Sequence, residues 1–463
     1  MKVCLERIIL IMKFLIYFFI LELFFGFNGK LLVFGGISIR HWLFAIVLIL
    51  LYGKALFVFL KKWEKEKLSV KTFSKFLKEE IRSFSYFDMV LLSFLLLHAI
   101  WIIWIPYTKL DTIPDALNIA ISSGLSISIM ALYFPAVYLL RNEKIEWEKY
   151  RKFVVGCFIS ISVLHIVIYI LERIQWQYDH SYYFMERVFD AWESLVNGHC
   201  ETPQIVMPAY AVRIIYGCNI FILMSFYFII GQTKKKYFLW ALLNIVALFT
   251  TGTRSLILGT VVGVFSTLCL DCCIHKWKKD TWKKCIVKMG IILVVSILMD
   301  SVLFQGMNVT RILSSFSVSE EVLEQGSPQS LEWTSSEYSV ESEIRGTTNS
   351  NSTRILQIKE LVKKFMEHPL IGHGFVLHGC DMQGILYIAK VGLLGVFLWG
   401  IFLATLLFRV IKMEKREKGS AIAVVYIVVA VLVDVQLQCM FGSLVMAMAV
   451  FLFLAMEYKK NKL

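Results

Sequence analysis

Arginines at the ends of apolar segments are the first residues of this sequence whose type and position could do chemistry. Arg254 follows the short Thr-Gly-Thr turn 251–253, and Arg213 lies just inside another apolar segment. Arg354 opens an amphipathic stretch. A guanidinium keeps its charge and can bind two phosphate oxygens at once, so three of them around one pocket would suit a diphosphate. The alternative is that each side chain merely extends from the apolar layer to water.

Titratable side chains and glycines alternate in a second segment, 367–381. Histidine, aspartate and glutamate can take a proton from a hydroxyl group, and glycine lets the backbone approach a ligand closely. The alternative is a turn that ends a helix and carries solvated histidines, and for His368 we prefer it. The remaining candidates for proton transfer are His373, His378 and Asp381, and the candidate loop glycines are Gly372 and Gly374.

The elements that position these residues are predicted to lie in a membrane. The 463 residues are 58% hydrophobic and 14% aromatic, with a mean hydropathy of +0.67, well above the values of soluble domains. Apolar stretches of membrane-spanning length recur along the chain and are too long for the strands of a β-barrel. We therefore predict an all-α fold, a polytopic bundle of about twelve transmembrane helices in one membrane domain over residues 1–463. The predicted spans are 7–26, 41–60, 86–105, 118–140, 153–171, 209–231, 237–251, 255–273, 286–304, 385–410, 420–438 and 440–457.

The net charge of +13 is distributed as in a membrane protein rather than a nucleic-acid-binding protein. Lysine and arginine collect in alternate loops, which the positive-inside rule assigns to the cytoplasm together with both termini. The intervening loops are predicted to face outward. Two of these outer loops are long, 172–208 and 305–384, and the second lies between spans nine and ten.

The second long outer loop is predicted to have two parts. Residues 314–352 are rich in Ser, Glu, Gly and Thr, a composition typical of a disordered surface loop. Residues 353–367 carry apolar side chains at helical spacing, with lysines on the other face, and Pro369 is expected to end the helix. We expect this amphipathic helix to lie along the membrane surface. Its apolar positions are Ile355, Ile358, Leu361, Val362, Phe365 and Met366.

The cysteines are not arranged as a disulfide framework. Of the ten, Cys200 and Cys380 fall in the predicted outer loops, so one bridge is the most that could form there. The segment 269–275 has three cysteines and a histidine with zinc-like spacing. It sits where a span meets the cytoplasm and has no second pair downstream, so we assign it to helix packing.

Four features of the second half of the chain resemble the O-antigen polymerase and O-antigen ligase superfamily (Wzy-type). The turn 251–255 is similar to the family's Gly-Ser-Arg turn. Arg354, a helix and then 368–374 (His-Pro-Leu-Ile-Gly-His-Gly) are similar to its outer loop, which ends in His-Pro-Leu-x-Gly-x-Gly. Gly392 and Gly395 open the tenth span like the family's glycine pair, and the long outer loop is the fourth feature. The resemblance covers most of the chain in topology and roughly its second half in motifs.

The resemblance implies a glycosyltransferase in the bacterial cytoplasmic membrane, acting on its outer side. The donor would be an undecaprenyl-diphosphate-linked oligosaccharide and the acceptor a glycan or a lipid-linked glycan. Membrane lipid, a chain-length regulator and a flippase would be partners, with no nucleic acid, catalytic metal or cofactor. Where ligases carry a His-Asn or similar dipeptide, this chain has Asp381-Met382. This difference favours a polymerase of O-antigen, capsular or exopolysaccharide repeat units over a ligase.

The expected mechanism is a single displacement that inverts the anomeric carbon. The three arginines would stabilise the charge that grows on the departing diphosphate, and a base would take the proton of the attacking hydroxyl. We rank the candidate bases in the order Asp381, His378, His373. A ligase remains the alternative within the family, and a lipid-linked oligosaccharide flippase or exporter, which makes no glycosidic bond, is the alternative from another class.

Overall fold

The computed structural model describes the chain in several ranges. They are 14–21, 33–34, 37–65, 85–109, 117, 129–142, short pieces between 153 and 171, 235–250, 254–276, 279–304, 350–377, 383–416, 425 and 429. Of the expected site residues, Arg213, His378 and Asp381 lie outside these ranges, as do Cys200 and Cys380.

The described residues are helical apart from turns and one short antiparallel pair, β1 (Val33–Phe34) with β2 (Ile37–Ser38). This agrees with the predicted helical fold. The described helices with defined bounds are α2 (Ile39–Lys65), α4 (Tyr86–Ala99), η2 (Ile100–Trp104), α5 (Ile105–Lys109), η3 (Ile129–Leu132), α7 (Tyr133–Asn142), α12 (Lys235–Thr250), α13 (Arg254–His275), α14 (Lys279–Phe304), α17 (Ser350–Glu367) and α18 (Gln383–Arg416).

Four helical segments of the described residues are long and apolar enough to cross a membrane. They are His41–Glu64, Tyr86–Lys109, Ile257–His275 and Gly384–Lys412, and each overlaps a predicted span. Many of their large apolar side chains are exposed, such as Trp104, Phe397 and Phe408, which suits a lipid-facing surface. The predicted total of twelve also depends on segments outside the described ranges and stays a prediction.

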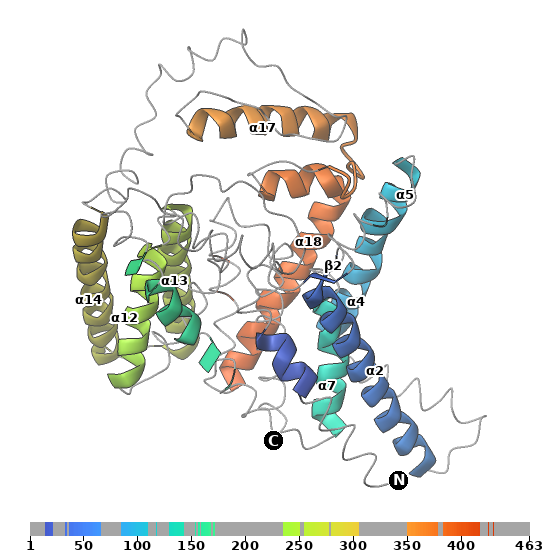
Figure 1. The fold of residues 1–463 in the computed structure, drawn as a ribbon, viewed down its shortest axis with the longest axis horizontal. Coiled ribbons are helices and arrows are strands. Elements are labelled where there is room, and N and C mark those ends of the chain that lie inside the picture. Colours follow the sequence, from blue (N-terminus) through green and yellow to red (C-terminus); the bar gives the residue numbers. More distant parts are fainter. Residues whose placement is uncertain are drawn as a thin grey trace.

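The helices α4 and α18 pack side by side and form the core on which the candidate site rests (Figure 1). The rings of Phe94 and Phe402 stack with their centroids 4.8 Å apart. Farther along α4, the Nε2 atom of His98 lies 2.6 Å from the hydroxyl oxygen of Tyr387. A histidine inside an apolar span thus makes a buried polar contact between two helices.

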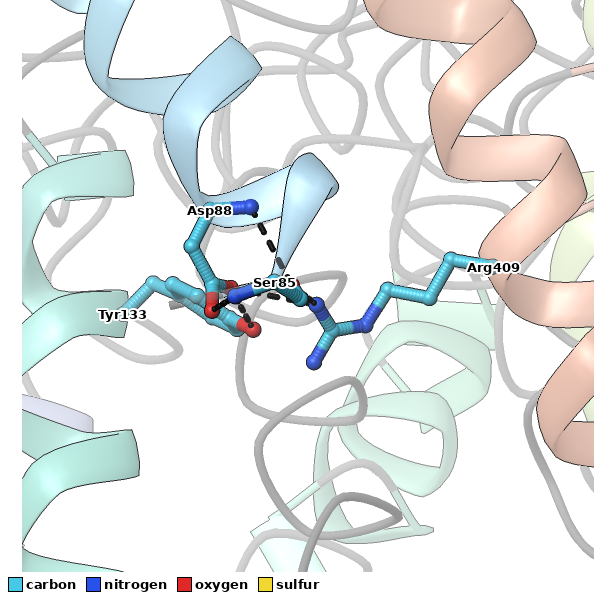
Figure 2. A network of polar contacts seen from close by, with 4 residues as sticks. All are labelled: Ser85, Asp88, Tyr133 and Arg409. Atoms are coloured by element: carbon cyan, nitrogen blue, oxygen red, sulfur yellow. Dashed lines mark hydrogen bonds and ion pairs between the residues drawn. The ribbon is translucent and has the colours of Figure 1, made fainter. Parts of the chain in front are cut away.

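A buried charged network joins the first turn of α4 to α18 and α7 (Figure 2). Ser85 caps α4 reciprocally with Asp88, since each backbone N–H donates to the other's side chain. The Nη1 atom of Arg409 lies 3.1 Å from Asp88 Oδ1, and the Tyr133 hydroxyl donates to the same oxygen over 2.8 Å. Asp88 and Arg409 are 2% and 9% exposed, so losing one partner would leave a buried charge uncompensated.

The helix α17 lies across one end of this pair and covers the first part of α18 (Figure 1). Leu361 is fully buried with Leu377, Leu386 and Ala389, and Ile358 and Phe365 pack against this cluster. The apolar face that was expected at the membrane surface is therefore partly used within the protein. Its other part stays exposed: Val362 is 49% and Met366 67% exposed.

A second group contains α12, α13 and α14, with α12 packed against both neighbours (Figure 1). The side-chain oxygen of Asn244 in α12 accepts a hydrogen bond from the Ser162 hydroxyl. These helices correspond to predicted spans seven to nine, and residues 251–253, the predicted turn before Arg254, lie outside the described ranges.

Candidate functional site

The His-Pro loop, residues His368–Leu377, packs against a break in α18. At Gly392 the backbone adopts φ +63° and ψ −170°, which interrupts the helix. A helical break leaves carbonyl groups before it and N–H groups after it without their usual partners, a costly state in a membrane.

The loop supplies those partners from both directions. The N–H groups of His373 and Gly374 donate to the carbonyls of Ala389 and Lys390, over 3.0 and 2.8 Å. In return, the N–H groups of Leu393 and Leu394 donate to the carbonyls of two loop residues, Pro369 and Leu370, over 2.8 and 3.1 Å. Two motifs that are separate in the sequence, the His-Pro loop and the glycine pair, are thus parts of one interlocked unit.

Glycine is required where these two backbones meet. Gly372 has φ +74°, and a Cβ atom there would lie 2.6 Å from the carbonyl oxygen of Ala389. A Cβ atom at Gly392 would lie 2.6 Å from the carbonyl carbon of Leu370 and 2.7 Å from the nitrogen of Gly372. Such distances are below van der Waals contact, so any larger residue would separate the loop from the helix.

A second helical irregularity faces the same loop. The segment η2, which continues α4, is π-helical, and π-helical turns leave backbone groups available and are frequent at functional sites. The carbonyl of Trp101 in η2 accepts from the N–H of Phe375 over 3.3 Å. Its indole Nε1–H donates to the carbonyl of Ile371 over 2.7 Å. Gly374 packs so closely here that a Cβ atom would lie 2.6 Å from Ile105.

His373 is the candidate base whose side chain the structure describes, and it is 4% exposed. Its Nε2 atom lies 2.8 Å from the carbonyl oxygen of Lys364, which can only accept, so Nε2 carries the proton. The Nδ1 lone pair then faces the ammonium of Lys109 at 3.4 Å. The imidazole is therefore held in one orientation and one tautomer.

The surroundings of His373 favour its neutral form, chiefly through burial. Burial lowers the pKa of His373, and the nearby Lys109 and His368 lower it further. The hydrogen bond to the Lys364 carbonyl and the carboxylate of Glu367 act in the opposite direction. Glu367 Oε2 lies 3.5 Å from His373 Nε2 and 3.3 Å from the ammonium of Lys364. The pair with Glu367 is ionic only when His373 is protonated, which the lowered pKa disfavours.

The remaining expected site residues are described in part. Arg254 is the first residue of α13 and Arg354 lies near the start of α17, but the structure describes neither side chain. The convergence of the three arginines therefore stays a prediction. His378 and Asp381 belong to the segment between Leu377, which is fully buried, and the start of α18.

The contribution of the span Tyr86–Lys109 was missed from the sequence. Trp101 and Lys109 reach loop residues that are more than 260 positions away in the chain, at separations of 270 and 264. The one sequence signal concerned Lys109, a lysine just beyond the predicted outer end of the span 86–105. The buried pair of Asp88 and Arg409 was missed for the same reason, since 321 positions separate them.

The fold and the loop define a helical membrane protein in which the helix α17 and the loop after it pack onto a broken span. Comparison with known families is more specific: residues 237–393 match the family described as O-antigen ligase. The match covers about a third of the chain and runs from α12 to the break at Gly392, so it includes the loop that repairs the break.

This match confirms the resemblance to the O-antigen ligase and polymerase superfamily, a family of membrane enzymes that transfer glycosyl groups. No curated protein and no solved structure matched the chain.

Proposed function

We propose that this chain polymerises lipid-linked oligosaccharide repeat units on the outer side of the bacterial cytoplasmic membrane. The transferred glycan would leave undecaprenyl diphosphate and join a sugar hydroxyl of the acceptor. The observation that carries the proposal is the family match over 237–393, because its boundaries enclose the His-Pro loop and reach the glycine at which that loop docks. The repeat units would belong to an O-antigen, capsular or exopolysaccharide.

The proposed chemistry assigns the arginines and the base to separate tasks. Arg213, Arg254 and Arg354 hold the departing diphosphate, because preorganised cations stabilise charge that grows during the reaction. The base is Asp381 or His378 ahead of His373. Both ring nitrogens of His373 have partners, Lys364 and Lys109, so its geometry suits orientation of the loop better than proton removal.

A ligase is the second candidate, because the matching family is described by that activity. A ligase would transfer the finished glycan to another acceptor and would use the same donor and the same leaving group. The Asp381-Met382 pair, at the position where ligases carry a His-Asn or similar dipeptide, favours the polymerase.

Deletion of the gene, with gel analysis of the surface glycan, tests the proposal. We expect glycans of a single repeat unit in place of long chains, and restoration by the intact gene but not by an Arg254→Ala variant expressed at the same level. Long chains that remain on the lipid carrier would identify a ligase. Repeat units retained on the cytoplasmic side would identify a flippase or exporter.

A further inference from the structure

We propose that the span Tyr86–Lys109, which lies outside the matched family segment, belongs to the functional site and contributes two positioning residues, Trp101 and Lys109. Trp101 holds the backbone of the His-Pro loop against the broken span, and Lys109 fixes the ring of His373. The inference rests on the proposed function in one respect, that the loop serves glycan transfer.

Trp101 contacts the loop at two points on either side of His373. Its indole N–H reaches the carbonyl of Ile371, and its own carbonyl receives the N–H of Phe375. The side chain is 2% exposed, so the indole has no freedom to turn away. Trp101 therefore holds the loop where Gly372 and Gly374 adopt positive φ angles.

Lys109 acts on His373 from the opposite side to α17. The Lys364 carbonyl of α17 accepts the Nε2–H, which leaves Nδ1 toward the Lys109 ammonium. Among the described residues, the other titratable groups that act on this ring are the Glu367 carboxylate on α17 and the His368 imidazole in the loop. On α18, the Lys390 ammonium lies over the neighbouring Phe375 ring at 5.0 Å. A cation at position 109 thus opposes protonation of the ring and holds the orientation that the loop needs.

These contacts matter because the expected base lies directly after the loop in the chain. Leu377 is buried against α17 and α18, and His378 and Asp381 come next, before α18 begins. Loss of the Trp101 contacts would let the loop shift, and with it Leu377, after which the expected base follows in the chain. Small displacements of a catalytic group lower the rate steeply. The N-terminal half of the chain would therefore set the geometry of a site whose recognisable motifs all lie in the C-terminal half.

The first test uses Trp101→Phe, which keeps an aromatic ring and removes the N–H donor. Its matched control is Trp104→Phe, in the same π-helical segment, because Trp104 is 64% exposed. Hydrogen–deuterium exchange of the peptide that contains 371–375 is measured in the full-length protein in detergent. We expect about tenfold faster exchange in Trp101→Phe, the effect of losing one buried hydrogen bond, and parental exchange in Trp104→Phe.

The second test uses glycan transfer in membranes of a strain that lacks the native gene, with lipid-linked repeat units extracted from that strain. Trp101→Phe and Lys109→Met should each lower the rate about tenfold, whereas Lys109→Arg should restore most of it because arginine also donates to Nδ1. In Lys109→Met the acidic limb of the pH profile should move to higher pH. The cation that helps to lower the pKa of His373 is then gone, so the ring protonates at a higher pH.

The proposal is overturned if loop exchange in Trp101→Phe equals that of Trp104→Phe, or if the loop loosens while transfer continues at the parental rate. An unshifted pH profile in Lys109→Met would remove Lys109 from the site. If the parent protein transfers no glycan, the proposed function is refuted. The exchange measurement still decides separately whether this span holds the loop.

Discussion

Replacing Gly392 by alanine should disconnect the His-Pro loop from α18. Alanine would have to adopt φ +63° and ψ −170°, a region that is essentially limited to glycine and costs other residues about 1–3 kcal/mol. Its Cβ atom would also meet the Leu370 carbonyl carbon at 2.6 Å, so the loop must move. If two of the four loop-to-helix hydrogen bonds are lost, this adds about 1–3 kcal/mol. The total is about 2–6 kcal/mol.

Gly400→Ala is the matched control, because Gly400 lies in the same helix and a Cβ atom there would meet nothing within 4 Å. Alanine is the better helix former, so this variant should be unchanged or stabilised by up to about 1 kcal/mol. Thermal unfolding of both purified variants in one detergent, together with gel analysis of surface glycan, measures the difference. Parental stability and parental chain lengths in Gly392→Ala would refute the interlocked arrangement of loop and helix.

The site and its supporting contacts give three further predictions. Arg254→Ala should lower glycan transfer about 10²- to 10³-fold without loss of folded protein, as expected for one preorganised donor, and near-normal polymer at matched expression would remove Arg254 from the mechanism. Asp381→Asn should impair transfer by purified protein more than His378→Ala, and full activity in both would end the assignment of the base. Asp88→Ala should destabilise the protein by about 3–5 kcal/mol, because it strands the charge of Arg409, whereas Tyr133→Phe should cost about 1 kcal/mol. Equal melting temperatures for these last two variants would contradict the ion-pair account.

The helices could be predicted from sequence because their signals are local. Long apolar runs gave the spans that α4, α13 and α18 occupy, and helical spacing gave 353–367 where α17 runs from Ser350 to Glu367. The glycine pair at Gly392 and Gly395 was visible as a motif, but the break in the helix was not. Whether a glycine interrupts a helix depends on whether another backbone segment can hydrogen-bond to the N–H and carbonyl groups that the break leaves without helical partners.

The arrangement of the loop could not be predicted because its partners are remote in the chain. The spacing of the motif 368–374 shows titratable groups beside flexible glycines, which suggests a ligand site as readily as a docking turn. The structure gives Gly372 and Gly374 a packing role against α18 and η2, and it gives His373 two hydrogen-bond partners. The amphipathic face of α17 was likewise ambiguous, since an apolar stripe can meet lipid or protein, and here one part packs on protein while another stays exposed.

Reconstitution of the purified chain in liposomes tests the central claim most directly. The vesicles would contain lipid-linked repeat units as the sole glycan, and the products would be separated by size and by attachment to lipid. The account predicts lipid-linked glycans that lengthen by whole repeat units, with one lipid diphosphate released for each bond formed. Folded protein that leaves the repeat units unjoined, or moves them across the bilayer without a new glycosidic bond, would contradict it.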